Sequence, residues 1–238
     1  MDSARIAALL EPLLDEPLSP PQLDQICVYM DLLLRWNARM NLTAIRNPEE
    51  IVTRHFGESL FLARHLFPNA DRASINALEG ANALEGAPSE LRLGGPVRVI
   101  DVGSGAGFPA LPIKLWAPAI ELTLIESNHK KATFLREVAR ALALTNVHVL
   151  TDRAEVVAAS GCAQAEVVTL RAVEHFESIL PHAVTFLVPH GTLALLVGAA
   201  QLPKLTVLSM MTWQLPIPVP LSQSRVLAIG VLAEVGNI

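Results

Sequence analysis

The sequence predicts an α/β protein with a mainly parallel sheet, a helical segment before the sheet and an antiparallel hairpin after it. From residue 97 onward, short apolar runs alternate with helical patterns, which is typical of a parallel sheet covered by helices on both faces. The first 67 residues contain a single glycine, Gly57, and keep a helical spacing of apolar residues. After Pro203, two extended runs are joined by "LSQ".

The first helix is expected over residues 19–37. Ser19 suits the N-cap position, and the two prolines that follow it suit the first turn. One face of this helix should carry the apolar residues Leu23, Ile26, Cys27, Met30, Leu33 and Leu34.

The second helix is expected to begin at "NPEE". Asn47 is the predicted N-cap, Pro48 the first helical residue, and Glu50 the third residue of a capping box. Helical spacing then continues through the apolar residues Ile51, Val52, Phe56, Leu60, Ala63 and Leu66.

The chain is expected to have three parts: a helical extension over 1–67, a loop or insertion over 68–96, and the α/β domain over 97–238. The loop contains one hexapeptide twice, as "NALEGA" at 76–81 and again at 82–87. Two copies of six residues are too few for a repeat architecture, so we interpret them as a duplication in a surface loop.

Within the α/β part, each strand pattern is followed by a helical one. Strands are predicted at 97–102, 121–126, 147–151, 166–170 and 192–197. Helices are predicted at 109–116, 129–143, 153–159 and 175–188. The final two runs, 205–220 and 224–235, should form an antiparallel hairpin on the sheet edge.

Composition excludes several classes of protein. The 238-residue chain has a net charge of −5, which argues against a strongly basic coat, although a local basic face remains compatible with it. Its two cysteines, Cys27 and Cys162, have no paired spacing that indicates a disulfide framework or a metal site. The N-terminus does not resemble a signal peptide, and the most apolar tract is interrupted by prolines and histidines. We therefore expect a monomeric cytoplasmic protein without metal or membrane partners.

The turn after the first strand, "DVGSGAGFP", is expected to hold a ligand. Its glycines follow a G-x-G-x-G pattern, so Phe108 stands where a dinucleotide-binding turn has its third glycine. The phosphate-binding loop G-x-x-x-x-G-K-[ST] is also absent. A tight turn with a bulky phenylalanine suits a ligand without phosphate, whose ribose and charged tail lie over residues lacking a Cβ.

Acidic residues at three successive strand ends indicate S-adenosylmethionine (SAM) as that ligand. Glu126 can accept both ribose hydroxyls, and Asp101 can organise the turn or reach the methionine ammonium through water. "DRAE" at 152–155 follows the third strand, where the adenine would lie. Each acid alone could instead cap a helix. Together they favour SAM at the carboxyl edge of the sheet.

Several blocks resemble one known family, the 16S rRNA guanine-N7 methyltransferases (RsmG, also GidB). These blocks are "RWNARMNLTAIRNPEEIVTRHF" at 35–56, "DVGSGAGFPALPIKL" at 101–115, "ESNHKKATFL" at 126–135, "DRAE" at 152–155 and "LRAV" at 170–173. The resemblance implies a class I, Rossmann-like SAM-dependent methyltransferase. The expected cofactor-binding residues are Asp101, Gly103, Ser104, Gly105, Gly107, Phe108, Glu126, Ser127, Ala154, Glu155 and Arg171.

The chain departs from the family pattern at four positions. These are Ala110 for a common glycine, Glu126 for an aspartate, Leu170 for a serine and Val197 for a lysine. The loss of the lysine bears on RNA contact or substrate positioning more than on SAM binding.

The resemblance implies 16S rRNA, free or in the small ribosomal subunit, as the substrate partner. Arg171 is the candidate for positioning the target guanine, and its alternative role is an ion pair with Glu155 or Glu126. Asn41, His55 and Lys130 are candidate RNA contacts. A thin set of basic residues accompanies them: Arg35, Arg39, Arg46, Arg54, Arg64, Lys114, Lys131, Arg136, Arg140 and Arg153.

Guanine N7 has a free lone pair, so its methylation needs no general base, and the sequence offers no nucleophile–base pair. Neither cysteine follows a proline, and "LRAV" stands where an exocyclic-amine methylase has [DN]-P-P-[FYW]. Ring-nitrogen, hydroxyl and carbon targets therefore stay open, and only the resemblance selects N7. The alternatives are a methyltransferase of a small molecule or protein, and a SAM-binding RNA module without turnover.

Overall fold

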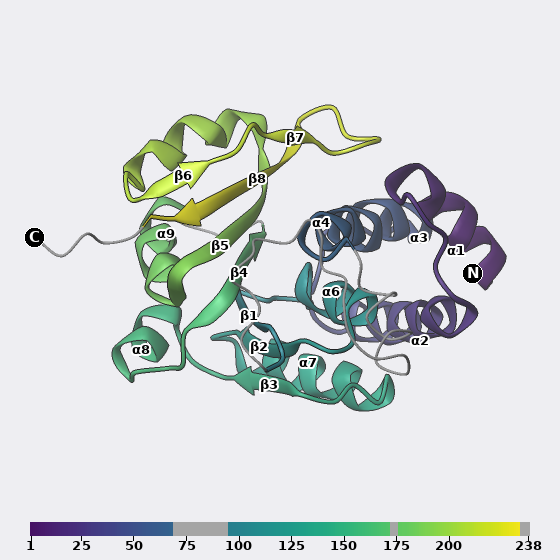
Figure 1. Cartoon of the computed structure of the whole chain (residues 1–238). Helices are drawn as coiled ribbons and strands as arrows, with labels where there is room; N and C mark the ends of the chain where they lie inside the picture. The colour runs from purple at the N-terminus through teal and green to yellow at the C-terminus, as the bar shows by residue number, and fades with distance from the viewer. Residues whose placement is uncertain (69–94, 172–175, 234–238) are drawn as a thin grey trace, which may run out of the picture.

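The computed structural model describes residues 1–68, 95–171 and 176–233. These residues form one twisted sheet with helices on both faces, and the N-terminal helices lie outermost on one side (Figure 1). The "NALEGA" repeat and the last two residues of "LRAV" lie outside the described residues. No helix in the described ranges is long and apolar enough to cross a membrane.

The strands of the described residues pair in the order β3-β2-β1-β4-β5-β8-β6, and the short β7 pairs with β8. The first five strands are parallel, whereas β8 runs antiparallel to β5, β6 and β7. Their bounds are β1 Arg98–Val102, β2 Glu121–Ile125, β3 Val147–Leu150, β4 Ala165–Arg171, β5 Leu187–Gly198, β6 Met211–Trp213, β7 Ile217–Pro218 and β8 Arg225–Leu232.

The helices of the described residues divide between the two faces of the sheet (Figure 1). On the side of the N-terminus lie α1 Ser3–Leu10, η1 Glu11–Leu13, α2 Pro20–Asn37, α3 Pro48–Ile51, the π-helical turn η2 Val52–Gly57, α4 Glu58–Leu66, α6 Ala110–Trp116 and α7 His129–Ala141. On the other side lie α8 Ala154–Ala159, α9 Phe176–Thr185 and η3 Ala199–Val207.

Alternate residues of each inner strand enter separate cores. In β1, Val99 joins the core beneath the N-terminal helices, while Ile100 and Val102 join the core beneath α8 and α9. This is the side-chain alternation expected of a strand covered on both faces. The first core includes residues of α1, α2, α4, α6 and α7, so the N-terminal helices and the sheet share one hydrophobic interior.

The predicted strands and helices of the α/β part are confirmed, with two corrections at the C-terminus. Strand β5 begins five residues before its predicted start, and its register with β4 shifts around Pro189–Gly191, where His190 has a φ of 61°. The run 205–220 is not one strand but the end of η3, followed by β6 and β7. Pro216, Pro218 and Pro220 lack the amide hydrogens that a continuous strand would use.

The N-terminal caps largely follow the sequence. Asn47 accepts the amides of Glu49 and Glu50, as an N-cap should. The Glu50 carboxylate does not complete the capping box, because it forms an exposed ion pair with Arg54 instead.

The buried face of α2 differs from the predicted one. It carries Gln22, Ile26, Tyr29, Met30, Leu32, Leu33 and Asn37, whereas Leu23, Cys27 and Leu34 are only partly buried. In α4, every residue from Glu58 to Ala63 is buried, because the helix is enclosed by the sheet, α6 and the first helices.

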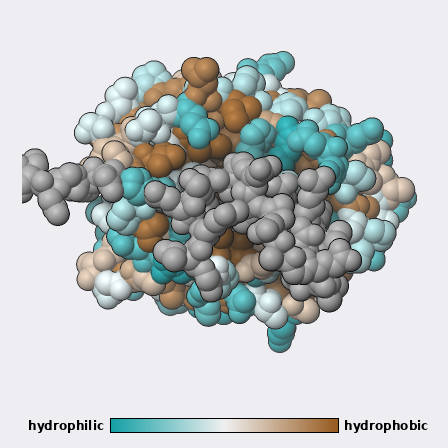
Figure 2. Space-filling model, in the orientation of Figure 1, coloured by the Kyte–Doolittle hydropathy of each residue, from teal (hydrophilic) through white to brown (hydrophobic). Residues whose placement is uncertain are grey.

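Apolar and polar residues are mixed on the face shown in Figure 2, and brown residues are most frequent in its upper part, where Figure 1 draws β6, β7 and β8. Val207, Met210, Leu215 and Leu221 are exposed large apolar residues of this C-terminal segment.

Candidate active site

A cleft of about 880 Å³ lies at the carboxyl ends of β1, β2 and β4. This volume is within the range of pockets that hold cofactor-sized ligands. The lining residues come from seven parts of the chain: Leu42, Thr43 and Ile45; Arg54 and His55; Val102 to Ala106 with Phe108; Ile125 to Ser127 with Lys131; Asp152 to Glu155; Arg171, Ser178, Ile179 and His182; and Arg225.

The glycine turn forms the floor of the cleft. Gly103, Gly105 and Gly107 have φ values of 73°, 57° and 88°, a region that favours glycine. The amides of Gly103 and Ser104 both donate to the carbonyl of Ile125, at 2.9 and 3.1 Å. The turn is therefore fastened to the end of the neighbouring strand.

Glu126 fastens the other side of the same turn. Its Oε2 accepts the amide of Gly105 at 2.8 Å, and its Oε1 accepts the amide of Asn128 at 2.7 Å. Each carboxylate oxygen has a second lone pair, so both oxygens can still accept a hydrogen bond from a ligand. Glu126 lines the cleft and also holds its backbone.

Asp101 lies behind the turn, and the structure does not include it in the cleft lining. The Thr169 hydroxyl donates to its Oδ1 at 2.6 Å, while Oδ2 has no partner among the described residues. Burial raises the pKa of Asp101 to about 6, an effect that nearby Glu126 reinforces and the Thr169 and Ser104 hydroxyls oppose. The Asp101 carboxylate therefore joins β1 to β4, and its backbone carbonyl accepts the hydroxyl of Ser104 in the turn at 3.1 Å.

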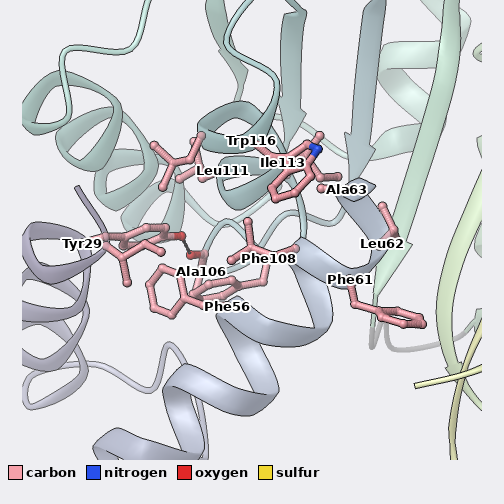
Figure 3. Close-up of a cluster of buried hydrophobic side chains, with 14 of the residues drawn as sticks. Tyr29, Phe56, Phe61, Leu62, Ala63, Ala106, Phe108, Leu111, Ile113 and Trp116 are labelled. Atoms are coloured by element: carbon pink, nitrogen blue, oxygen red, sulfur yellow. Dashed lines mark hydrogen bonds between the residues drawn. The ribbon is translucent and has the colours of Figure 1, made fainter. Parts of the chain in front are cut away.

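Phe108 lies between two rings in the wall of the cleft. Tyr29 stacks on it with centroids 5.3 Å apart and His55 with centroids 4.8 Å apart, while Phe56 meets its edge at 5.1 Å. The Tyr29 hydroxyl donates to the carbonyl of Ala106, as the dashed line in Figure 3 shows. A Cβ on Gly107 would meet this hydroxyl and Leu111, so Gly107 serves packing and does not line the cleft.

Sequence reasoning did not identify Tyr29 as part of the site. It is the only tyrosine of the chain, and it falls three residues after Ile26 and four before Leu33. This helical spacing places Tyr29 on the same face as Ile26 and Leu33, so its burial could have been predicted from the sequence.

His55 presents a neutral imidazole to the cleft. The amide of Ile45 donates to the Thr43 hydroxyl oxygen at 3.1 Å, and that oxygen lies 2.7 Å from Nε2 of His55. The hydroxyl and Nε2 therefore share one hydrogen bond, while Nδ1 is buried and has no partner among the described residues. Burial, with a smaller effect from Arg171 and other arginines, lowers the pKa of His55 to about 3.

Arg171 forms a buried ion pair that the sequence did not predict. Its Nη2 donates to Oε2 of Glu58 at 2.9 Å and to the carbonyl of Arg54 at 2.6 Å. The alternative role, an ion pair with Glu155 or Glu126, is wrong, because Arg171 pairs with Glu58 of α4 instead. Nη1 is buried and has no partner among the described residues.

Burial lowers the pKa of Arg171 to about 10, an effect that Glu58 opposes and Arg225 and Arg54 reinforce. The guanidinium therefore stays protonated at neutral pH. Nε of Arg225 lies 3.9 Å from the same oxygen of Glu58, so this carboxylate forms ion pairs with both arginines.

The other predicted residues divide between the cleft and its surroundings. Ser127, Ala154 and Glu155 line the cleft, as expected of cofactor contacts. Asn41 is exposed outside the cleft lining, and its side-chain oxygen accepts a hydrogen bond from Arg46 at 2.9 Å. Lys130 lines a neighbouring groove instead.

Charged residues of both signs line the cleft, and most of the cations are ion-paired. The cations Arg54, Lys131, Arg153, Arg171 and Arg225 line it, against the acids Glu126, Asp152 and Glu155. The sequence did not predict that Arg225 lines the cleft, because Arg225 lies after the last turn, far from every motif. Across residues 1–68, 95–171 and 176–233, no group of three or more histidine, cysteine, aspartate and glutamate side chains could hold a metal ion.

The strand order and the glycine turn at the carboxyl edge define the class I SAM-dependent methyltransferase fold. A ribosomal protein L11 methylase from Lactobacillus delbrueckii subsp. bulgaricus shares it, with a TM-score of 0.51 and 15% identity over 74% of this chain and 79% of that one. The chain belongs to the rRNA small subunit methyltransferase G family, whose profile matches residues 22–76 and 70–212.

Relatives named ribosomal RNA small subunit methyltransferase G occur in several bacteria. The chain is 40% identical over 173 residues to the relative from Chloroflexus aggregans, covering 72% of this chain and 62% of that protein. It is 36% identical over 174 residues to the relative from Xylella fastidiosa strain M23, covering 73% and 68%. The chain thus spans about two thirds of the length of these relatives.

Proposed function

We propose that this protein transfers the methyl group of SAM to N7 of a guanine in small-subunit (16S) rRNA, as a cytoplasmic monomer. The choice of rRNA is supported by membership of the rRNA small subunit methyltransferase G family. Lys131 supports it as well, since this cation lines the cleft and has no ion-pair partner among the described residues. An anionic substrate suits such a cleft.

The cleft residues fit SAM. The turn from Gly103 to Gly105 brings backbone without Cβ atoms to the floor, and Glu126 retains lone pairs for the ribose hydroxyls. Ala154 and Glu155, at the start of α8, are proposed to border the adenine. The backbone hydrogen bonds of Glu126 already fix its carboxylate, so little side-chain freedom remains to be lost on binding.

SAM supplies an activated methyl group on a sulfonium, and the N7 lone pair of guanine is free at neutral pH. The protein therefore needs no base, and its task is to align the reacting atoms and exclude water. Arg171 is proposed to hold the target, because it carries buried donor groups at the end of β4 that the described residues leave partly unused. Guanine O6 is the natural acceptor, since N7 must keep its lone pair for the methyl group.

In the sequence, Val197 stands where the family commonly has a lysine, and this difference favours the alternative of a small-molecule or protein substrate. In the structure, the Val197 side chain is buried in the core beneath α9 and pairs with Val226 of β8. Since the position lies in an apolar interior, the valine there gives no specific support to a different substrate.

Mapping 7-methylguanine in the 16S rRNA of cells with and without this protein tests the proposal. Loss of one 7-methylguanine in the deletion strain, with restoration by the intact chain, is the expected result. Unchanged rRNA in the deletion strain would overturn it. Restoration by a variant that cannot bind SAM would also overturn it, because the methyl group would then have another source.

A further inference from the structure

A second cavity, of about 610 Å³, lies between the end of α2 and α7. We call it the α2–α7 groove. Its lining includes Arg35, Trp36, Arg39, Met40, Lys130 and Glu137. No residue of the glycine turn borders it.

The α2–α7 groove concentrates positive charge. Arg35, Arg39 and Lys130 face a single acid, Glu137, which already accepts the indole N–H of Trp36 at 3.2 Å. Among the described residues, the charged groups of Arg39 and Lys130 have neither a hydrogen-bond partner nor an ion-pair partner. Free cations gathered in one groove of a net acidic chain favour a polyanionic ligand.

The groove adjoins the cleft at two places in the chain. Met40 lines the groove and Leu42 the cleft, while Lys130 lines the groove and its neighbour Lys131 the cleft. The lining residues of the two cavities are therefore near neighbours in the chain, and both cavities border the first turn of α7. A chain molecule with one unit in the cleft can therefore continue into the groove.

Trp36 adds an aromatic surface beside the cations. Its ring is half-buried, packing against Phe134 with centroids 5.6 Å apart, and the remainder borders the groove. Aromatic rings alternating with cations are the usual means of holding single-stranded nucleic acid, through base stacking and phosphate contacts.

We propose that the α2–α7 groove binds the single-stranded rRNA segment next to the target guanine. Arg35, Arg39 and Lys130 contact its phosphates, and Trp36 offers a stacking face to one base. This inference rests on the proposed function, since it assigns a path to the same substrate. It also gives Lys130 an RNA-binding role outside the cleft.

The test compares Arg39→Ala, Lys130→Ala and the double variant with the parent, all as full chains. Arg140→Ala is the matched control, because Arg140 is an exposed cation on α7 that lines neither cavity. The substrate is a 16S rRNA transcript, and the measurements are kcat, KM for RNA, SAM affinity and the salt dependence of RNA binding. Thermal unfolding confirms that each variant is folded.

Each groove substitution should raise KM for RNA by about three- to tenfold and should leave SAM affinity and kcat unchanged. Each should also reduce the slope of log affinity against log salt by about 0.7, the value for one phosphate contact to a single strand. Arg140→Ala should behave as the parent does.

Three results would overturn the groove proposal. The first is a double variant with parental KM and salt slope, and the second is an equal loss in Arg140→Ala. The third is full activity of the double variant on naked rRNA with a loss only on assembled small subunits, since that would indicate a protein partner. A parent that binds SAM but methylates neither the transcript nor assembled small subunits would instead overturn the proposed function, which separates the two failures.

Discussion

Arg171, the last residue of β4, lies 2.9 Å from the carboxylate of Glu58 at the start of α4, and both side chains are almost fully buried, at 5% and 3% exposure. The pair joins the carboxyl edge of the sheet to the N-terminal helices. It also fixes the guanidinium beside the cleft, because Nη2 is used by Glu58 and by the Arg54 carbonyl.

Glu58→Gln should destabilise the fold by about 3 kcal/mol, because it leaves the buried Arg171 without its counter-charge. Glu50→Gln is the control, since Glu50 forms an exposed ion pair with Arg54 and should cost less than about 1 kcal/mol. Urea unfolding of both variants measures the difference. Equal costs would show that the buried pair contributes no more than a surface pair.

Arg171→Lys should lower kcat at least about tenfold at saturating SAM and RNA, because lysine keeps the charge but loses the planar fork. SAM affinity should stay close to that of the parent. Arg153→Ala, an exposed cation at the rim of the cleft, is the control and should keep its kcat. A parental rate for Arg171→Lys at saturation would contradict target positioning by the fork.

Gly107→Ala should cost about 1–3 kcal/mol more than Gly161→Ala. Both glycines have positive φ, 88° and 75°, so both substitutions carry backbone strain. Only at Gly107 does the added Cβ meet the Tyr29 hydroxyl and Leu111, whereas nothing lies within 4 Å at Gly161. Thermal or urea unfolding compares them, and indistinguishable losses would mean that the ring can move away freely.

Glu126→Ala should weaken SAM binding by about 10- to 150-fold, the effect of one lost charge-assisted hydrogen bond, and Glu126→Gln should weaken it less, because its amide oxygen still accepts. The amide has a single acceptor oxygen, so either the Gly105 or the Asn128 amide loses its partner. Calorimetric titration with SAM measures the affinity. Glu121→Gln, at the start of β2 and outside the cleft lining, is the control, and unchanged affinity in both Glu126 variants would indicate that the turn holds its shape unaided.

His55 should make the protein less stable in acid. Burial, and to a smaller extent Arg171, Arg54 and Arg225, lower the pKa of His55 to about 3. His55 therefore stays neutral in the folded protein at pH values below 6.5 where the same side chain is protonated in the unfolded chain. The stabilisation is complete above pH 6.5 and is lost as pH falls toward 3. Asp101, with its pKa raised to about 6, acts oppositely between about pH 4 and 6.

The comparison of parent with His55→Asn separates these effects, since both proteins contain Asp101. The difference in their free energies of unfolding should shrink by up to about 1.4 kcal/mol for each pH unit between 6 and 4. Urea titrations at several pH values measure it. A difference that stays constant over this range would rule out the buried neutral imidazole.

Local patterns allowed much of the fold to be predicted. The run Val97 to Asp101, the glycines after it and the alternation of strands with helices depend on neighbours in the sequence, so β1, its turn and α6 were found. The caps at Ser19 and Asn47 are local as well. The antiparallel C-terminal strands were predicted, but the closely spaced prolines divide the first predicted strand into the end of η3, β6 and β7.

The long-range parts of the candidate site could not be predicted in this way. Glu58 and Arg171 lie 113 residues apart, and nothing near either one indicates the other. Glu58 sits within an apolar helical pattern in which a carboxylate usually faces water. Its burial follows only from the enclosure of α4 on all sides, which is a property of the assembled layers.

The stack of Tyr29 on Phe108 bears on how such proteins can be recombined. One half of this aromatic wall comes from α2 and the other from the turn after β1, with the Tyr29 hydroxyl bound to the turn at Ala106. A chimaera joined between α4 and β1 would take its two halves from different parents. It would keep every residue of the glycine motif. The position of Phe108 in the cleft wall would still depend on whether the donor of the first helices has an aromatic ring of similar size at the position of Tyr29.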